Sequence, residues 1–218
     1  MAQAFSTQAK IPLRILCFGD SLTAGTTQMF QLHPYAPHLQ KALTESTKLQ
    51  SLDIEVMHLG FPGWTSEDLL KDADGPKGLR TTISRNQEPP ISLVILLAGT
   101  NDLGSSKSSS EISEGVISLH KLCLEEKVSN TIAIGIPSSF YQTLSSKASE
   151  VAKTANQGIE SFCESDPRAA YFPFPFEYSK DDGNWDPDGL HFSAKGYQVL
   201  GESLAPAVED IVAKQLNL

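Results

Sequence analysis

The sequence predicts an α/β protein, a three-layer α/β/α sandwich with a flavodoxin-like, mostly parallel sheet of five strands. Two observations indicate this fold class. Short apolar runs with the length of buried strands recur along the 218 residues, and segments with a helical repeat of apolar side chains separate them. Strands that alternate with helices form right-handed βαβ units, which make the strands parallel and cover both faces of the sheet. Because the chain contains no internal repeat and no linker, we expect one domain over residues 1–218.

Five segments have the character of strands. The first, Leu13 to Phe18, is apolar almost throughout, as expected for a strand that is buried on both faces. The others are Ile54 to Leu59, Ser92 to Ala98, Thr131 to Ile136 and Ala170 to Phe174. The most apolar of them begins at Ser92 and predicts a central strand.

Helices are predicted where apolar side chains recur every three or four residues. Long helices are expected from about Pro34, around Ile112 to Leu122, from about Lys147 to Cys163, and from about Ser193 onward. A short helix follows Thr65, because Thr65 and Asp68 have the spacing of a capping box. We expect loops after Ser21, through Gln28, and from Gly104 to Ser110.

The composition argues against several classes of partner. With a formal net charge of −9 and no basic run, neither nucleic acid nor stable membrane association is expected. Three widely spaced cysteines suggest neither a disulfide framework nor a zinc site. No signal peptide and no membrane-spanning segment is visible, which favours a cytoplasmic location. We expect no metal and no cofactor, and the sequence does not indicate an oligomeric state.

Polar or small residues follow three of the predicted strands. Ser21 comes just after the first strand, Gly60 follows the second, and Asn101 follows the third. Because the carboxyl ends of parallel strands lie along one edge of a sheet, we expect these residues to lie close together. His191 precedes the last helix and can fold back over the same edge.

These residue types supply the groups that acyl transfer requires. Ser21 can attack a carbonyl carbon, and His191 can accept the serine proton and return it to the leaving group. Backbone N–H groups of Ser21 and Gly60 and the side-chain amide of Asn101 can donate to the oxyanion.

A carboxylate must orient the imidazole, and two aspartates compete for this role. Asp188 lies three residues before His191, and a tight turn through Gly189 would bring its carboxylate to Nδ1. Asp186 is the alternative, although it reads more simply as a turn residue before Pro187. We therefore favour Asp188.

Four blocks of the sequence resemble those of the GDSL, or SGNH, hydrolase family, in the family's order. The blocks are Phe18 to Thr23, Leu59 to Gly63, Ala98 to Asp102 and Asp188 to His191. The resemblance implies a serine esterase or acylhydrolase with the SGNH hydrolase fold. It also implies that Ser21, Gly60, Asn101 and His191 carry the four family roles, with Asp188 completing a catalytic triad.

We therefore predict hydrolysis of small-molecule carboxylic esters through an acyl-enzyme intermediate. Short loops and the lack of an apolar lid favour short acyl groups such as acetyl. The candidate substrate-binding residues are Leu22, Trp64 and Leu190. Alternatives within the family are an acetylated-carbohydrate esterase, a lysophospholipase or a thioesterase. A non-catalytic ligand-binding protein and a flavodoxin-like nucleotide binder are the competing hypotheses from other classes.

Overall fold

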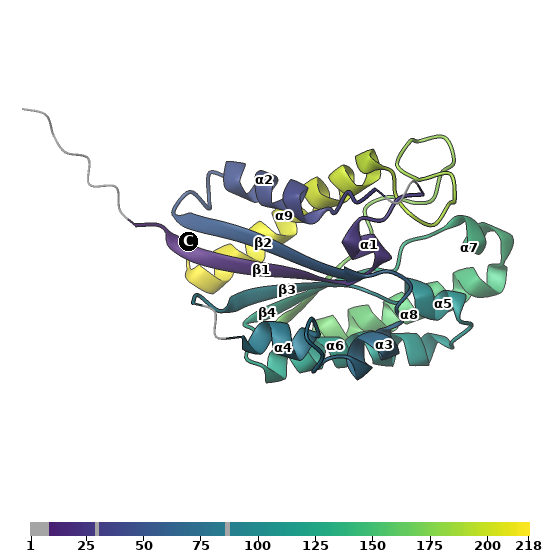
Figure 1. Ribbon diagram of the computed structural model, residues 1–218, viewed down its shortest axis with the longest axis horizontal. Coiled ribbons are helices and arrows are strands. Elements are labelled where there is room, and N and C mark those ends of the chain that lie inside the picture. The colour runs from purple at the N-terminus through teal and green to yellow at the C-terminus, as the bar shows by residue number, and fades with distance from the viewer. Residues whose placement is uncertain (1–8, 29–30, 86–87) are drawn as a thin grey trace, which may run out of the picture.

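The computed structural model describes residues 9–28, 31–85 and 88–218, and a parallel sheet of five strands forms its centre (Figure 1). The strands are β1 (Ile11–Asp20), β2 (Leu52–Phe61), β3 (Ile91–Leu97), β4 (Asn130–Ile134) and β5 (Ala169–Phe172). They are arranged in the order β2-β1-β3-β4-β5, and all their pairings are parallel. This is the order of flavodoxin-like sheets, so the predicted fold class is confirmed.

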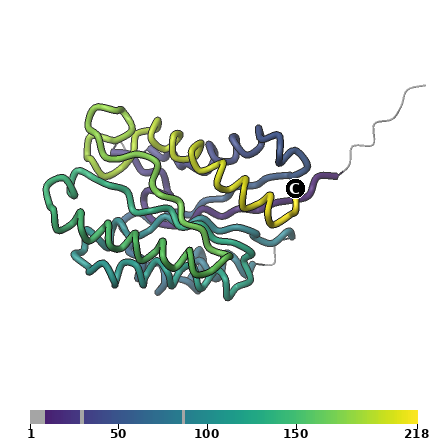
Figure 2. Tube along the Cα trace, turned by 180° about the vertical axis from the view of Figure 1, so that it is seen from behind, coloured from purple at the N-terminus to yellow at the C-terminus, as the bar shows by residue number. Residues whose placement is uncertain are grey.

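Helices cover both faces of the sheet. One face carries α2 (Ala36–Glu45) and α9 (Ala194–Leu216), and Figure 2 shows these two side by side. The other face carries α3 (Ser66–Lys71), α4 (Leu79–Ser84), α6 (Ser109–Glu125) and α8 (Ser146–Ser165). Three short helices lie at the carboxyl ends of the strands, namely α1 (Ser21–Ala24), α5 (Thr100–Gly104) and α7 (Phe140–Leu144) (Figure 1).

The core consists of two apolar clusters, one on each face of the sheet. Successive side chains of a strand point to opposite faces. Accordingly, Ile15 and Cys17 of β1 belong to the cluster under α2 and α9, whereas Leu16 and Phe18 belong to the cluster under α6 and α8. Burying one large aliphatic side chain stabilises the fold by about 1.5–3 kcal/mol. Apolar and polar side chains therefore do not alternate along β1, because both faces of this strand are buried.

The structure corrects the predicted loop after β1. Residues Ser21 to Ala24 form α1, because the Asp20 carboxylate caps the helix by accepting a hydrogen bond from Leu22 N at 2.9 Å. Gly25, with φ of 76°, ends the helix in the left-handed conformation that glycine favours.

The second predicted loop, Gly104 to Ser110, is wrong at both ends, since Gly104 is the last residue of α5. Ser108 and Glu111 form a capping box, so α6 begins at Ser109 and the predicted loop through Ser110 runs into it. Helices α4, α5 and α7 were not predicted, because they are too short to show a helical repeat of apolar residues.

Candidate active site

The carboxyl ends of β1, β2 and β3 bring the predicted site residues to one edge of the sheet. Ser21 is the first residue of α1, directly after β1, and Asn101 lies in α5, just beyond β3. Gly60 lies inside β2 and pairs in register with Gly19. The prediction that the second strand ends before Gly60 is therefore two residues short.

Gly60 leaves room for the backbone of α1. A Cβ added there would lie 2.1 Å from Ala24 N and 2.6 Å from Asp20 O. Both atoms belong to the backbone of the α1 segment, which cannot move as a flexible side chain would. The missing side chain of Gly60 thus lets β2 approach the helix that presents Ser21.

His191 lies between Ser21 and Asp188. Its Nε2 atom is 3.0 Å from Ser21 Oγ, and its Nδ1 atom is 2.8 Å from Asp188 Oδ2. The other carboxylate oxygen of Asp188 accepts backbone hydrogen bonds from Leu190 N and His191 N, both at 2.9 Å. Gly189, with φ of 67°, allows this tight turn. Serine, imidazole and carboxylate thus form one chain of hydrogen-bonding groups.

The carboxylate of Asp188 is held in its ionised form. Burial by itself raises the pKa of Asp188, but the hydrogen bonds from the His191 ring and from the two backbone N–H groups outweigh it and lower the pKa below its ordinary value. A charged carboxylate at Nδ1 favours the imidazole tautomer that carries its proton on Nδ1. Nε2 is then the nitrogen that can accept a proton from Ser21.

Asp186 lies in the same turn but does not contact the imidazole. Its carboxylate accepts a hydrogen bond from Gln28 N, and its backbone N–H donates to His191 O at 2.9 Å. Asp186 therefore shapes the loop, in line with the interpretation of this residue as part of a turn.

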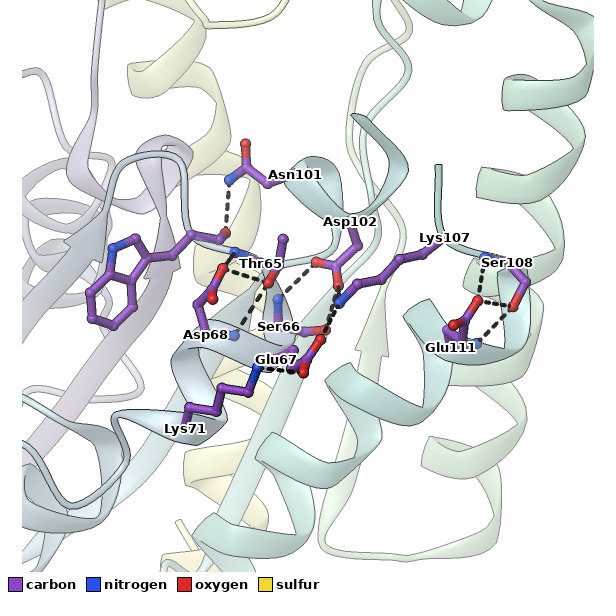
Figure 3. Close-up of polar contacts among 11 residues, drawn as sticks. Thr65, Ser66, Glu67, Asp68, Lys71, Asn101, Asp102, Lys107, Ser108 and Glu111 are labelled. Carbon is purple, nitrogen blue, oxygen red and sulfur yellow. Dashed lines mark hydrogen bonds and ion pairs between the residues drawn. The ribbon is translucent and has the colours of Figure 1, made fainter. Parts of the chain in front are cut away.

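The Asn101 side chain is oriented by the loop that follows β2. Its Nδ2 atom donates to Trp64 O at 2.8 Å (Figure 3). A primary amide has two N–H bonds, so one can bind Trp64 O while the other donates to a different acceptor.

Asp102 joins the segment that carries Asn101 to α3. Its side chain is fully buried and accepts hydrogen bonds from Ser66 N at 2.8 Å and Ser66 Oγ at 2.7 Å (Figure 3). The ammonium of Lys107 lies 3.0 Å from Asp102 Oδ1 and 3.3 Å from Glu67 Oε2. Because a buried carboxylate is costly unless it is paired and hydrogen-bonded, this network stabilises the position of α5.

Asp20 has an unusual environment for a carboxyl group next to Ser21. It is fully buried, and among the described residues no hydrogen-bond donor reaches its Oδ2 atom. Burial raises the pKa of Asp20 to about 7, and the nearby charge of Asp102 adds to the shift, while the hydrogen bond from Leu22 N opposes it.

The raised pKa of Asp20 predicts a dependence of stability on pH. An unfolded aspartate loses its proton near pH ~3.9, whereas folded Asp20 keeps it up to about pH 7. The folded state binds more protons between these values, so the contribution of Asp20 to stability is lost as the pH rises through this window.

Asp20→Asn keeps the oxygen that caps α1 and stays neutral. Urea unfolding at pH 5 and pH 8 should therefore show the variant gaining stability relative to the wild type at the higher pH. If the free energy of unfolding changed with pH in the same way for the two proteins, the raised pKa of Asp20 would be refuted.

A cavity of about 540 Å³ opens beside Asn101 and Asp188. Its lining includes Asn101 of α5, Asp188 and Leu190 of the histidine loop, and Phe140 of α7. Of the three predicted substrate-binding residues, Leu190 alone lies in this lining.

The other two predicted substrate-binding residues lie elsewhere. The Leu22 side chain is completely buried in the cluster under α2 and α9, so it packs in the core. The Trp64 ring stacks on Phe61, with ring centroids 4.6 Å apart, and its backbone oxygen holds Asn101. Sequence reasoning missed Phe140, Tyr141 and Leu144 of α7, whose signal is an apolar group inside a Ser-rich segment.

Other reactive groups can be placed in the part of the chain that the structure describes. No three His, Cys, Asp or Glu side chains lie there in an arrangement that could hold a metal ion. None of its helices combines the length and the apolarity that a membrane crossing needs. Cys17, Cys123 and Cys163 are buried and unpaired, and burial raises the pKa of the Cys17 thiol to about 12. A thiol with so high a pKa is not a nucleophile at neutral pH.

Solved structures share this fold over nearly their whole length. The inhibitor-bound aryl esterase of M. smegmatis superposes with a TM-score of 0.69 at 19% identity, covering 91% of this chain and 99% of that chain. A carbohydrate acetylesterase family member from Sinorhizobium meliloti gives 0.70 at 19% identity, covering 92% and 99%. The lipase/acylhydrolase from Enterococcus faecalis gives 0.65 at 21% identity, covering 91% and 96%. At these identities the likeness demonstrates a common fold.

Sequence comparison identifies the family. No curated protein matched the chain. The model of the GDSL-like lipase/acylhydrolase family matches residues 17–199, which extend from the middle of β1 into α9 and include Ser21, Asn101, Asp188 and His191. This match covers most of the 218 residues, and the chain therefore belongs to the GDSL-like lipase/acylhydrolase family.

Proposed function

We propose that this protein is a serine-dependent hydrolase of carboxylic esters, with Ser21, His191 and Asp188 as its catalytic triad and residues 1–218 as one catalytic domain. The observation that carries the proposal is the continuous chain of hydrogen-bonding groups from Ser21 Oγ through the imidazole to the Asp188 carboxylate, with separations of 3.0 and 2.8 Å. Family membership supports the same class of reaction.

In the first half of the reaction, Ser21 Oγ attacks the carbonyl carbon of the ester, and His191 Nε2 accepts the serine proton. The carbonyl oxygen gains a negative charge in the tetrahedral intermediate. When the C–O bond to the alcohol breaks, the imidazolium returns the proton to the leaving alkoxide. The acyl group is then bound to Ser21 as an ester.

The second half repeats these steps with water as the nucleophile. His191 Nε2 accepts a proton from water while the water oxygen attacks the acyl carbon. The tetrahedral intermediate collapses, the bond to Ser21 Oγ breaks, and the serine recovers its proton from the imidazolium. Asp188 keeps the imidazole oriented and stabilises its positive charge in both halves.

Three groups are proposed to donate hydrogen bonds to the oxyanion: the backbone N–H groups of Ser21 and Gly60 and the Asn101 side chain. Asn101→Ala is expected to lower kcat by about 100- to 1000-fold with a smaller change in KM, because the donor acts on charge that develops in the transition state. Asn130→Ala, at the amino end of β4, is the matched control and should keep its activity. Equal kcat for Asn101→Ala and wild type would exclude the amide from this role.

A fluorophosphonate reagent tests the nucleophile directly. Mass spectrometry should find one phosphonyl group on the peptide that contains Ser21, together with loss of esterase activity. Ser139 also lines the cavity, so Ser139→Ala serves as the control and should still be labelled. Ester hydrolysis by a protein that is labelled elsewhere, or not at all, would contradict the proposed mechanism.

A further inference from the structure

We infer that the cavity between α5 and α7 binds the acyl group of the ester and that it is built for a medium-length acyl chain, with octanoyl as the test case. The inference rests on the proposed function and specifies its substrate. It differs from the short acyl groups that the sequence favours, because α7, which the sequence did not reveal, forms one wall of the cavity.

The position of the cavity places it within reach of the acyl group of the ester. Asn101 lines it, and this side chain is the proposed donor to the oxyanion. In the tetrahedral intermediate, the carbon that carries the oxyanion also carries the acyl chain and the oxygen of the alcohol. The space next to Asn101 is therefore where the chain of the acyl group can extend from the reacting carbon.

The size and the lining of the cavity favour more than two carbons. Its volume of about 540 Å³ lies within the range of roughly 300–1,000 Å³ that is typical of small-molecule sites. An acetyl group would leave most of this space unfilled. Apolar side chains from three separate segments line it, namely Leu103, Phe140, Tyr141, Leu144 and Leu190.

The apolar residues of α7 have little to pack against in the core. None of the residues of α7 is buried, and Phe140, Tyr141 and Leu144 are 46%, 49% and 71% exposed. An exposed apolar group beside a cavity is typical of a surface that a ligand covers. A bound acyl chain would remove these side chains from water.

Helix α7 is attached to the loop that carries Asp188 and His191. Phe140 N donates to Gly189 O at 2.9 Å, and the Gln142 side chain donates to Pro137 O at 2.8 Å. Leu144 is one helical turn, about 6 Å, beyond Phe140 on the same side of the helix. The helix therefore extends from the triad loop, with Leu144 at the end farther from it.

The test is a series of p-nitrophenyl esters with a constant alcohol and acetyl, butyryl or octanoyl as the acyl group, below the micelle concentration. Each methylene removed from water contributes a factor of about four to binding, so kcat/KM of the wild type should be at least about tenfold higher for octanoate than for acetate. Leu144→Gln should lower kcat/KM for octanoate about tenfold and change that for acetate less than about twofold. Ile11→Gln is the matched control, because Ile11 is 50% exposed at the amino end of β1.

Two results would overturn the inference while leaving the serine mechanism intact. One is a wild-type kcat/KM that falls steadily from acetate to octanoate. The other is a Leu144→Gln variant whose kcat/KM changes by the same factor for acetate, butyrate and octanoate, or does not change for any of them. Either result is expected if the cavity holds the alcohol.

A binding measurement decides the case in which no ester is hydrolysed in a Ser21-dependent way. Calorimetric titration of the Ser21→Ala protein with octanoate and butyrate should show tighter binding of octanoate, and Leu144→Gln should weaken it. Absence of octanoate binding would overturn the cavity assignment, whereas binding without hydrolysis would overturn only the proposed function.

Discussion

Replacing Ser21 with alanine is expected to lower kcat for p-nitrophenyl acetate by about 10⁴-fold or more, because the attacking oxygen is lost and no acyl-enzyme can form. The substitution removes one hydroxyl whose hydrogen-bond partner is His191, 3.0 Å away. The cap of α1 depends on the Asp20 side chain and remains in place. The variant should therefore keep its fold, which circular dichroism and urea unfolding can check.

The contradicting outcome is clear for this variant. A folded Ser21→Ala protein that keeps most of the wild-type turnover would show that water, or another side chain, attacks the ester. In that case the contact between His191 Nε2 and Ser21 Oγ, 3.0 Å apart, would not take part in the reaction.

Replacing Asp188 with asparagine is expected to lower kcat by about 10⁴-fold with little change in stability at neutral pH. The reason lies in the backbone hydrogen bonds. Leu190 N and His191 N both donate to Asp188 Oδ1, so the single oxygen of asparagine would occupy that position. Its NH₂ group would then face His191 Nδ1 and donate to it. The imidazole would carry its proton on Nε2 and could not accept the proton of Ser21.

Asp186→Asn is the matched control for this prediction. It removes the same charge two residues away, and asparagine can still accept the hydrogen bond from Gln28 N. Its kcat should stay within about threefold of the wild type, as for a substitution outside the reacting groups. Similar losses in the two variants would indicate that the negative charge of the loop matters more than the contact of Asp188 with the imidazole.

The fold class and the candidate reacting groups follow from the sequence alone. Buried strands have a local signature in their apolar runs, and a parallel sheet necessarily aligns the carboxyl ends of those strands. The positions of Ser21, Gly60 and Asn101 after three such runs were therefore sufficient to predict one shared edge. Asp188 was also preferred to Asp186 by spacing alone, and the structure places Asp188 at 2.8 Å from the imidazole. Their catalytic roles remain predictions.

The surroundings of these groups could be seen only in the folded protein, because most of the contacts join segments that are distant in the chain. The reason for glycine at position 60 is the backbone of α1, and the support of α5 comes from Ser66, which lies 36 residues from Asp102. Leu22 looks suitable for a pocket in the sequence, yet its side chain is enclosed in the core, whereas Trp64 stacks on Phe61 and borders a different cavity beside Asp68. The five residues of α7 are too few to show a helical period, so its wall of the cavity could be recognised only in three dimensions.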